Sequence, residues 1–416
     1  MIVLYDAEIE MSTKYALDKK RVLFLGAAYA QMPIIREAKN RGWYVITCDY
    51  LPDNPGHKLA DEYYNVSTTD FEGVLYLAKK VKPDFVLAYA SDPAAPTAAW
   101  VSEQLGLPNN NYKSVQLLSE KDLFRKFLAQ NGFNTPKAVS IRREDENNNL
   151  KSLKFPIIIK PTDSSGSKGI SKVDNFTQVD TAIQNAFSFS RNSRIIAEEF
   201  IDSEGAQLHG DGFVVDGELI FYYLGDHHYN GKVNPFVPYS TTWPSVKSSN
   251  VILKIGSELK KAITLSGFKN GAVNIEIRVS RSERIFIMEI GPRSGGNFVP
   301  QVIKYATGFN MVHATLDIYD NKKYQHAITT KKNAAYYVIH SNEEGILKRL
   351  EINDEIKLYV KEFHQYIQPG EKVRSFQSAN AAIGVLLLLF NNRQEMDFYI
   401  KNMNRYIQLQ IKRLKQ

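Results

Sequence analysis

The sequence predicts an α/β region followed by an α+β body, and three observations lead to this fold class. Strand-like and helix-like segments alternate from residue 21 to about residue 106, which is typical of parallel βαβ units. Beyond residue 155 short β-rich runs dominate, and helices separate only some of them. A length of 416 residues suits two or three domains better than one hydrophobic core.

The composition excludes several classes of protein. Hydrophobic residues make up 44% and charged residues 23%, which are globular values and not those of a disordered or fibrous chain. The net charge of +7 suits an anionic ligand such as a nucleotide and does not demand a nucleic-acid partner. Cys48 is the one cysteine, so neither a disulfide framework nor a thiolate-rich metal site is expected.

The chain is expected to be cytoplasmic and to have no membrane partner. Acidic residues interrupt the short apolar run at the N-terminus, so it lacks the pattern of a signal peptide. The most apolar stretch, AAIGVLLLLF at residues 381–390, is too short to span a bilayer and is typical of a buried strand or a short core element.

The first region, residues 21–118, is predicted to be a βαβ domain, preceded by an appended segment at residues 1–20. Its opening strand ends in LGAAYAQ, which contains a single glycine, Gly26. A dinucleotide-binding loop would need the pattern GxGxxG in this turn, so no pyrophosphate cradle is expected. The strands are expected at residues 21–26, 43–50 and 84–90, and the helices at 30–42, 71–83 and 94–106.

The second region, residues 119–330, is predicted to hold two α+β subdomains that divide near residue 200. The remaining residues, 331–416, are predicted to form an α+β lid that ends in a basic amphipathic helix packed on the body. Within the second region we expect strands at residues 155–160, 194–201, 208–226, 271–279 and 284–291, and helices at 121–132, about 175–189 and about 250–266.

A run of small residues follows the apolar strand FPIIIK, which ends in Lys160. Small residues allow backbone N–H groups to converge on an anion, and serine hydroxyls and lysine add donors and positive charge. Lys160 itself would place a point charge near a phosphate. The segment is a candidate phosphate-binding loop, although a mobile surface hairpin is an equally good interpretation. Its members are Ser164, Ser165, Gly166, Ser167, Lys168 and Gly169.

Two glutamates are predicted to face each other on an antiparallel hairpin at residues 271–291. Apolar residues alternate along its first strand, which puts Glu276 on the opposite face. A turn centred between Ser282 and Glu283 would pair Glu276 with Glu289, and strict alternation along the second strand would put Glu289 on the same face as Ile287.

Such a pair suits a cation. Directly opposed Cβ atoms lie about 5 Å apart, and two carboxylates at that spacing repel unless a cation lies between them. Hard oxygen ligands suit Mg²⁺ brought in by substrate phosphates. The alternative interpretation is that both are surface glutamates paired with Arg278 and Arg293.

These motifs occur in a fixed order: Lys160 with its loop, EEFI at 198–201, NIEIR at 274–278 and MEIGPR at 288–293. The order closely resembles the ATP-grasp superfamily over roughly residues 20–320. It is most similar to the biotin carboxylase and carbamoyl-phosphate synthase branch, including the L-amino acid ligases. The resemblance implies an ATP-grasp fold with an N-terminal βαβ (pre-ATP-grasp) domain and a C-terminal α+β segment.

The resemblance also implies roles for individual residues in ATP binding. Lys121 and Lys160 would bind the phosphates, and the loop from Ser164 to Gly169 would close over them. The strand with Glu198, Glu199 and Ile201 would hold adenine by a side chain and two backbone groups, and Gln207 stands where many relatives bind the ribose with a glutamate.

The same resemblance assigns the metal and the acyl group. Glu276 and Glu289 match the magnesium pair, for Mg²⁺ or for Mn²⁺ in its place, and Arg293 matches the arginine that steadies the acyl phosphate. Many relatives carry an asparagine two residues after the second glutamate as a further ligand. Here that position is Gly291, and Asn297 is a weak substitute for it.

The implied function is an ATP-dependent carboxylate–amine (or thiol) ligase that forms an acyl phosphate and releases ADP and phosphate. Its partners would be small-molecule carboxylates and amines, and a homodimer would follow family analogy. The alternatives are a bicarbonate-activating carboxylase or carbamoyl-phosphate synthase-like enzyme and, from another class, a non-catalytic nucleotide-binding module. His227 and His228 would contact substrate, act as a base, or form a solvated loop pair.

Overall fold

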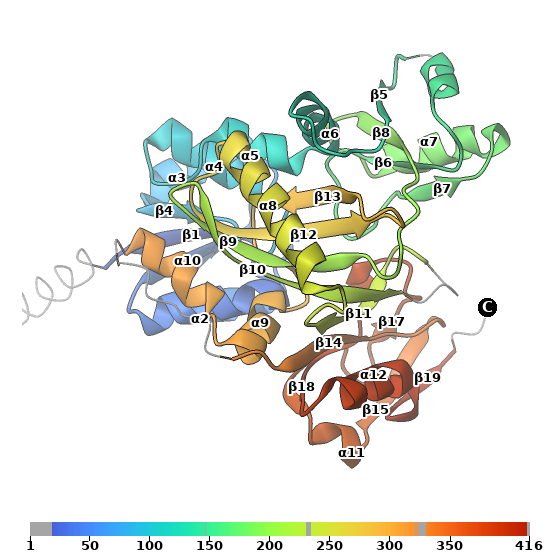
Figure 1. Cartoon of the computed structure of the whole chain (residues 1–416). Coiled ribbons are helices and arrows are strands. Elements are labelled where there is room, and N and C mark those ends of the chain that lie inside the picture. Colours follow the sequence, from blue (N-terminus) through green and yellow to red (C-terminus); the bar gives the residue numbers. More distant parts are fainter. Residues whose placement is uncertain (1–18, 146, 230–233, 321, 323–329, 414–416) are drawn as a thin grey trace, which may run out of the picture.

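The computed structural model describes residues 19–145, 147–229, 234–320, 322 and 330–413. Most of the predicted appended segment therefore lies outside the described residues. Figure 1 shows a first domain on the left, a small subdomain at the upper right, and a central sheet that continues into the C-terminal segment at the bottom. Lys20, at the entry to the first domain, donates to Asp320 Oδ1 over 2.8 Å and so fastens this domain to the body.

The first domain is the predicted βαβ unit. Its four strands pair in parallel in the order β3-β2-β1-β4. Successive residues of β1 face opposite sides: Val22 packs with α2 and α10, and Leu23 packs with α3 and α4. The elements are β1 (Arg21–Leu25), β2 (Tyr44–Cys48), β3 (Glu62–Tyr64), β4 (Phe85–Leu87), α2 (Met32–Asn40), α3 (Phe71–Val81), α4 (Ala95–Leu105) and, not predicted, α5 (Tyr112–Ser119).

The small subdomain is an antiparallel sheet of order β5-β8-β6-β7 with α7 packed on it. Its strands are β5 (Ala138–Arg142), β6 (Ile157–Pro161), β7 (Ser171–Val173) and β8 (Arg194–Glu199), and its helices are α6 (Lys121–Gln130) and α7 (Val179–Ser188). Lys160 lies near the end of β6, so the sheet itself carries the predicted phosphate-binding lysine.

An eight-stranded antiparallel sheet forms the centre of the molecule, in the order β13-β12-β9-β10-β11-β14-β18-β16. Helix α8 covers one face, and α9 and α10 cover the other. The elements are β9 (Leu208–Val215), β10 (Glu218–Tyr229), β11 (Pro238–Trp243), α8 (Ser249–Ser266), β12 (Gly271–Val279), β13 (Ile285–Gly291), α9 (Val299–Thr307), α10 (Met311–Tyr319), β14 (Asn333–Ile339), β16 (Val360–Gln365) and β18 (Gly384–Phe390).

The C-terminal segment continues the central sheet, because β14 pairs with β11. A further sheet, β17-β15-β19, completes it. The predicted helix over the basic tail is wrong beyond residue 402: α12 (Arg393–Asn402) ends there, and β19 (Ile407–Lys412) follows. The reason is a period of two, since Ile407, Leu409 and Ile411 alternate with exposed polar residues. The other elements are β15 (Gly345–Ile352), α11 (Asp354–Lys357) and β17 (Lys372–Val373).

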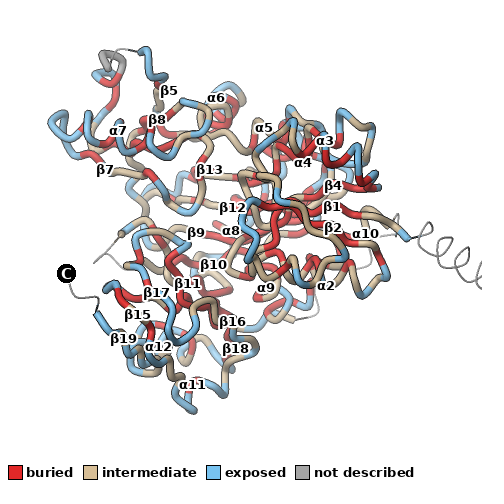
Figure 2. The backbone as a smooth tube through the Cα atoms, turned by 180° about the vertical axis from the view of Figure 1, so that it is seen from behind, coloured by how far each residue is buried: buried red, intermediate tan, exposed pale blue. Residues whose placement is uncertain are grey.

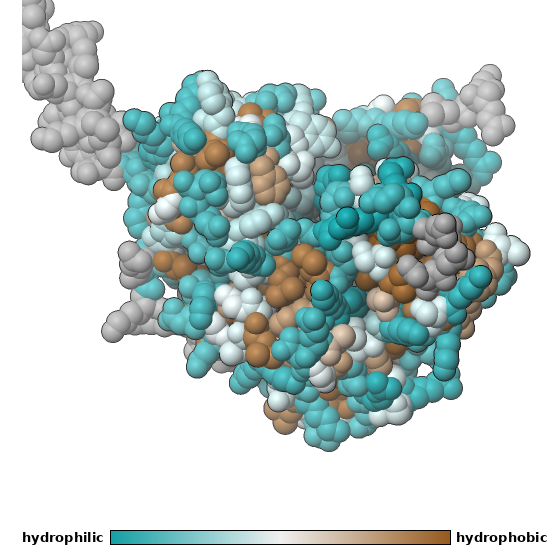
Figure 3. Space-filling model, turned by 90° about the horizontal axis from the view of Figure 1, so that it is seen from above, coloured by the Kyte–Doolittle hydropathy of each residue, from teal (hydrophilic) through white to brown (hydrophobic). Residues whose placement is uncertain are grey.

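Short 3₁₀ turns connect several elements: η1 (Tyr29–Gln31), η2 (Pro55–Leu59), η3 (Asn147–Ser152), η4 (Phe176–Gln178), η5 (Ala379–Ala381) and η6 (Met403–Arg405). Burial is concentrated in the strands, while the outer loops and helix faces are exposed (Figure 2). Viewed from above, the surface is mainly hydrophilic, with hydrophobic residues in small groups (Figure 3). Among the described helices, none has the length and apolar character needed to cross a membrane.

Candidate active site

A cavity of about 650 Å³, here called the main cavity, is lined by both the small subdomain and the central sheet. Asp92 of the first domain and Tyr336 of the C-terminal segment complete its wall, so all parts of the chain contribute. The predicted site residues that line it are Lys121, Lys160, Ser164, Ser165, Gly166, Ser167, Glu198, Glu199, Ile201, Gln207, Glu276, Glu289, Arg293 and Asn297.

The phosphate loop is only partly in the cavity. Lys168 is exposed and does not line it, and Gly169 is buried away from it. A Cβ at Gly169 would lie 2.9 Å from Pro161 Cγ, at φ +70°, so this glycine serves packing and chain direction. The prediction that both residues contribute to the phosphate site is therefore not supported by their positions, whereas Lys172 of β7 does line the cavity.

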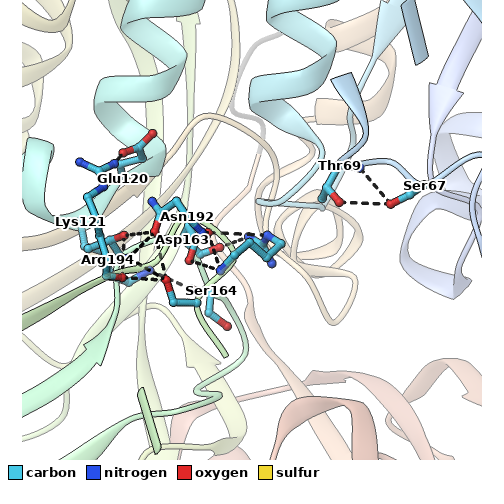
Figure 4. A network of polar contacts seen from close by, with 11 residues as sticks. Ser67, Thr69, Glu120, Lys121, Asp163, Ser164, Asn192 and Arg194 are labelled. Atoms are coloured by element: carbon cyan, nitrogen blue, oxygen red, sulfur yellow. Dashed lines mark hydrogen bonds and ion pairs between the residues drawn. The ribbon is translucent and has the colours of Figure 1, made fainter. Parts of the chain in front are cut away.

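The first predicted lysine joins the loop to the carboxylates. Lys121, at the start of α6, donates to the carbonyl oxygen of Ser164 over 2.9 Å, and its Nζ lies 3.6 Å from Glu289 Oε2. Figure 4 shows Lys121 beside Ser164, with Asp163 next to them. Asp163 accepts the backbone N–H of Asn192 over 2.9 Å, which anchors the base of the loop.

The second lysine belongs to a buried triad. Glu198 accepts from Lys160 Nζ through one oxygen and from Arg125 Nε over 2.8 Å through the other. Burial lowers the pKa of Lys160, and Glu198 opposes this effect. Burial would raise the pKa of Glu198, but Arg125 and Lys160 lower it to about 2. The triad fixes the ammonium in place and leaves Glu198 a structural partner as well as a candidate adenine contact.

Glu276 and Glu289 pair directly across β12 and β13, as predicted. A β-bulge produces this register. Nearer the turn, Ile277 pairs with Ile287, so Met288 is an extra residue in β13. The strands beside the turn are thus centred on Ser282, half a residue from the predicted centre.

Because of the bulge, the residues of β13 that face the core differ from those predicted. Ile287 and Ile290 both pack in the core under α8, although strict alternation would put them on opposite faces. Glu289 does not share the face of Ile287, as was predicted, because the extra residue reverses the alternation.

Of the two glutamates, Glu276 has a raised pKa. Burial and the neighbouring Glu289 raise its pKa to about 7. Gln207, predicted to hold the ribose, donates to Glu276 Oε2 over 2.8 Å and accepts from Arg278 Nε over 2.9 Å. The two opposed carboxylates fit a divalent cation, whose charge would relieve their repulsion.

Asp92, which no sequence motif identified, holds Arg293 in place. Arg293 Nε donates to Asp92 Oδ1 over 2.6 Å, and a second guanidinium nitrogen donates to Oδ2. Burial would raise the pKa of Asp92, but Arg293 lowers it. A Cβ at Gly291 would lie 3.0 Å from Asp92 Oδ1, so a larger residue at this position would press on the Asp92 side chain. The available signal was the position of Asp92 just after the parallel strand β4.

His209 is a second cavity residue that no sequence motif identified. Its Nε2 accepts from Asn274 Nδ2 over 2.9 Å, because that amide nitrogen also donates to Asp211 Oδ1 over 2.8 Å. The ring proton is therefore on Nδ1, which is buried without a partner among the described residues in a side chain that lines the main cavity. Burial lowers the pKa of His209 to about 3, so the ring is neutral.

The two predicted histidines, His227 and His228, lie in different surroundings. His227 lines the main cavity and stacks on His209 with centroids 4.2 Å apart, whereas His228 contacts Thr242 Oγ1 over 2.9 Å. Burial lowers the pKa of His227 well below its usual value, which disfavours it as a base near neutral pH. Asn297 lies within hydrogen-bonding reach of the Tyr336 hydroxyl.

This geometry defines a nucleotide-type site between two sheets, and comparison with known proteins agrees. Residues 153–301 match the family model described as ATP-grasp domain. A formate-dependent phosphoribosylglycinamide formyltransferase from Rhodococcus jostii (strain RHA1) is 25% identical over 294 residues, covering 69% of this chain and 72% of that protein.

Solved structures resemble the whole chain. The L-amino acid ligase from Bacillus licheniformis has a TM-score of 0.80 and 20% identity, covering 95% of this chain and 99% of that one. The biotin carboxylase domain of the Hydrogenobacter thermophilus 2-oxoglutarate carboxylase has a TM-score of 0.75 and 16% identity, covering 94% and 91%. Residues 153–301 are therefore an ATP-grasp domain.

Proposed function

We propose that the protein is an ATP-dependent carboxylate–amine ligase that activates a carboxylate as an acyl phosphate and releases ADP and phosphate. The observation that carries the proposal is the convergence of Lys121, Lys160, Glu276, Glu289 and Arg293 on one cavity. Lysines and a carboxylate-bound cation balance phosphate charge, and an arginine beside them suits a developing acyl phosphate. A thiol acceptor would use the same first half-reaction.

ATP would bind with its phosphates at Lys121 and Lys160, under the backbone of the loop from Ser164 to Ser167. The apolar residues Ile158 and Met288 of the cavity wall suit an adenine ring. Backbone groups of Glu199 and Ile201 would contact its edge, and Gln207 would face the ribose.

The cavity residues fit Mg²⁺, and Mn²⁺ would use the same oxygen ligands. Glu276 and Glu289 would hold the cation, because they are opposed and the pKa of Glu276 is raised to about 7 by burial and by Glu289. When bound, the cation would neutralise charge on the phosphoryl oxygens. Asn297 is a weaker candidate ligand.

Arg293 and His209 would act on the acyl group. A carboxylate oxygen attacks the γ-phosphorus of ATP, and the bond to the β–γ bridging oxygen breaks, so that ADP leaves. Arg293, held by Asp92, and the Nδ1–H of His209 would donate to the acyl phosphate. An amine then attacks the acyl carbon, the carbon–oxygen bond to phosphate breaks, and the amine loses a proton.

Phosphate release from Mg-ATP tests the proposal. The names of the relatives suggest three acids to compare, namely formate, bicarbonate and L-amino acids, each with and without amines. We expect phosphate release that requires both an acid and an amine, and a hydroxamate when hydroxylamine replaces the amine. Absence of nucleotide binding by calorimetry would refute the proposal. Release with bicarbonate and no amine would favour a carboxylase instead.

Homodimerisation is proposed by analogy. The Hydrogenobacter biotin carboxylase domain was crystallised as a dimer. Light scattering of the purified chain would decide between a monomer and a dimer.

A further inference from the structure

A second cavity, of about 600 Å³, lies between the central sheet and the C-terminal elements α12, η6 and β19. Its size lies within the range of about 300–1,000 Å³ that small-molecule sites occupy. It borders the main cavity at Tyr229, which lines both; on β14, Tyr336 lines the main cavity and its neighbour Tyr337 lines the second. Successive residues of a strand face opposite sides, so along β14 the two cavities lie on opposite faces of the sheet.

Rings form one wall of the second cavity. The centroids of Tyr239, Tyr337 and His340 are 5.7, 5.9 and 6.2 Å apart. Phe376 stacks behind His340 with centroids 4.5 Å apart, which fixes the plane of the imidazole. Aliphatic side chains such as Ile407 and Leu409 line the opposite part. This surface suits a flat, apolar ring.

Polar groups converge on the same cavity from separate elements. His340 Nδ1 donates to the Val338 carbonyl oxygen over 2.8 Å, which leaves Nε2 as an acceptor when the ring is neutral. Tyr337 is only 8% exposed, and its side chain lines the cavity. Further polar groups come from the loop after β14 and from the α12–η6 region: Asn342, Lys401 and Asn404.

The charged side chain among the described residues that line the second cavity is positive. Lys401 is its cationic lysine, and no acidic side chain is among the described residues that line the cavity. Lys401 also makes no ion pair within the described part of the chain. A lysine and two amide side chains in the same lining as an uncharged aromatic wall favour an anionic ligand.

We propose that the second cavity binds a planar aromatic carboxylate, with its ring against Tyr239, Tyr337 and His340 and its carboxylate toward Lys401. Apart from Tyr229, which lines both cavities, this site shares no described lining residue with the proposed site of phosphoryl transfer. The proposal therefore does not depend on the ligase assignment.

Calorimetry of the full chain with three probes tests the proposal. Indole-3-acetate carries the ring and the carboxylate, tryptamine replaces the carboxylate with a cation, and acetate lacks the ring. We expect indole-3-acetate to bind with a Kd on the order of 0.1–1 mM. Tryptamine and acetate should each bind about tenfold more weakly or worse.

Substitutions in each cavity test where indole-3-acetate binds. Tyr337→Leu and Lys401→Gln should each weaken indole-3-acetate binding about tenfold. Lys348→Gln is the matched control, because this exposed lysine lines neither cavity, and Glu289→Gln tests the main cavity. Both should leave binding unchanged. Tyr239→Leu replaces Tyr337→Leu if the latter fails to fold.

Three results would overturn the proposal. The first is no binding of indole-3-acetate at about ten times the expected Kd. The second is equal binding by the tyrosine and lysine variants and the wild type. The third is loss of binding in Glu289→Gln or on addition of Mg-ATP, because either would move the ligand into the main cavity.

Discussion

The two cavities share Tyr229 and otherwise lie on opposite faces of one sheet, and they differ in how their charged groups are paired. In the main cavity, charged side chains form ion pairs with one another: Lys160 with Glu198, and Arg293 with Asp92. In the second cavity, Lys401 makes no ion pair within the described residues. Paired charges are held in position before a ligand arrives, which is what catalysis of phosphoryl transfer requires. Unpaired groups on an aromatic wall can bind a ligand but are not arranged to catalyse.

The largest effect should follow from breaking the carboxylate pair. Glu289→Gln keeps the size of the side chain and removes the charge, so we expect turnover to fall by about 10²- to 10³-fold. Steady-state phosphate release measures it. Glu283→Gln, at the exposed turn of the same hairpin, is the matched control and should retain full turnover. Similar turnover rates for both variants would show that Glu289 does not contribute to catalysis.

Loosening the arginine clamp should have the next largest effect. Asp92→Asn removes the charge that orients Arg293, and we expect kcat to fall by about 10- to 100-fold while the Kd of ATP stays unchanged. Rapid-quench kinetics and calorimetry separate the two quantities. Asp53→Asn, an exposed change in the same domain, provides the control. A weakened ATP affinity with normal kcat would contradict a positioning role.

Removing the unpartnered donor should cost less. His209→Phe keeps a ring to stack on His227 and deletes the Nδ1–H, so we expect kcat/KM for the acid to fall by about tenfold. His209→Gln, which retains an N–H donor, should recover part of the loss. Equal losses in both variants would indicate that His209 only supports packing.

The charge balance of the main cavity predicts a modest pH effect on stability. Because the pKa of Glu276 is raised to about 7, the folded protein holds a proton there that the unfolded chain releases near its ordinary pKa of 4.5. Without metal, stability should therefore fall as pH rises from about 5 to about 7.

Calorimetric scans of the wild type and of Glu276→Gln isolate this contribution. The Tm difference between them should change by about 2–4 °C across that range. Mg²⁺ should reduce the change, because it replaces the proton. A Tm difference that does not vary with pH would contradict the assigned coupling.

The smallest effect should come from the second cavity. Lys401→Gln lies on the far face of the sheet, so turnover with saturating substrates should stay within about twofold of the wild type. Phosphate release again measures it. A loss approaching that of Glu289→Gln would mean that the two cavities form one functional site.

Much of the fold and the central part of the site were predictable from local patterns. Alternation of period two located the hairpin, and the spacing of βαβ segments identified the parallel sheet. Glu276 and Glu289 were paired correctly, but the predicted route omitted the bulge at Met288, which the turn sequence SRSE does not reveal.

Other features depend on contacts between distant segments. Asp92 meets Arg293 across 201 residues, and its position after β4 indicates a site residue without indicating which partner it binds. The buried triad of Lys160, Glu198 and Arg125 likewise joins three separate elements. Lys168 was predicted from its place in a small-residue loop, but the direction of its side chain depends on the positive φ values around it.

The most direct test of the account is the fate of a labelled oxygen. An accepted acid carrying ¹⁸O in its carboxylate is incubated with Mg-ATP and an amine, and the released phosphate is analysed by mass spectrometry. The acyl-phosphate route predicts transfer of one ¹⁸O into each phosphate, because the attacking carboxylate oxygen leaves with it. Unlabelled phosphate would show that the carboxylate never attacks the γ-phosphorus, and it would contradict the proposed function.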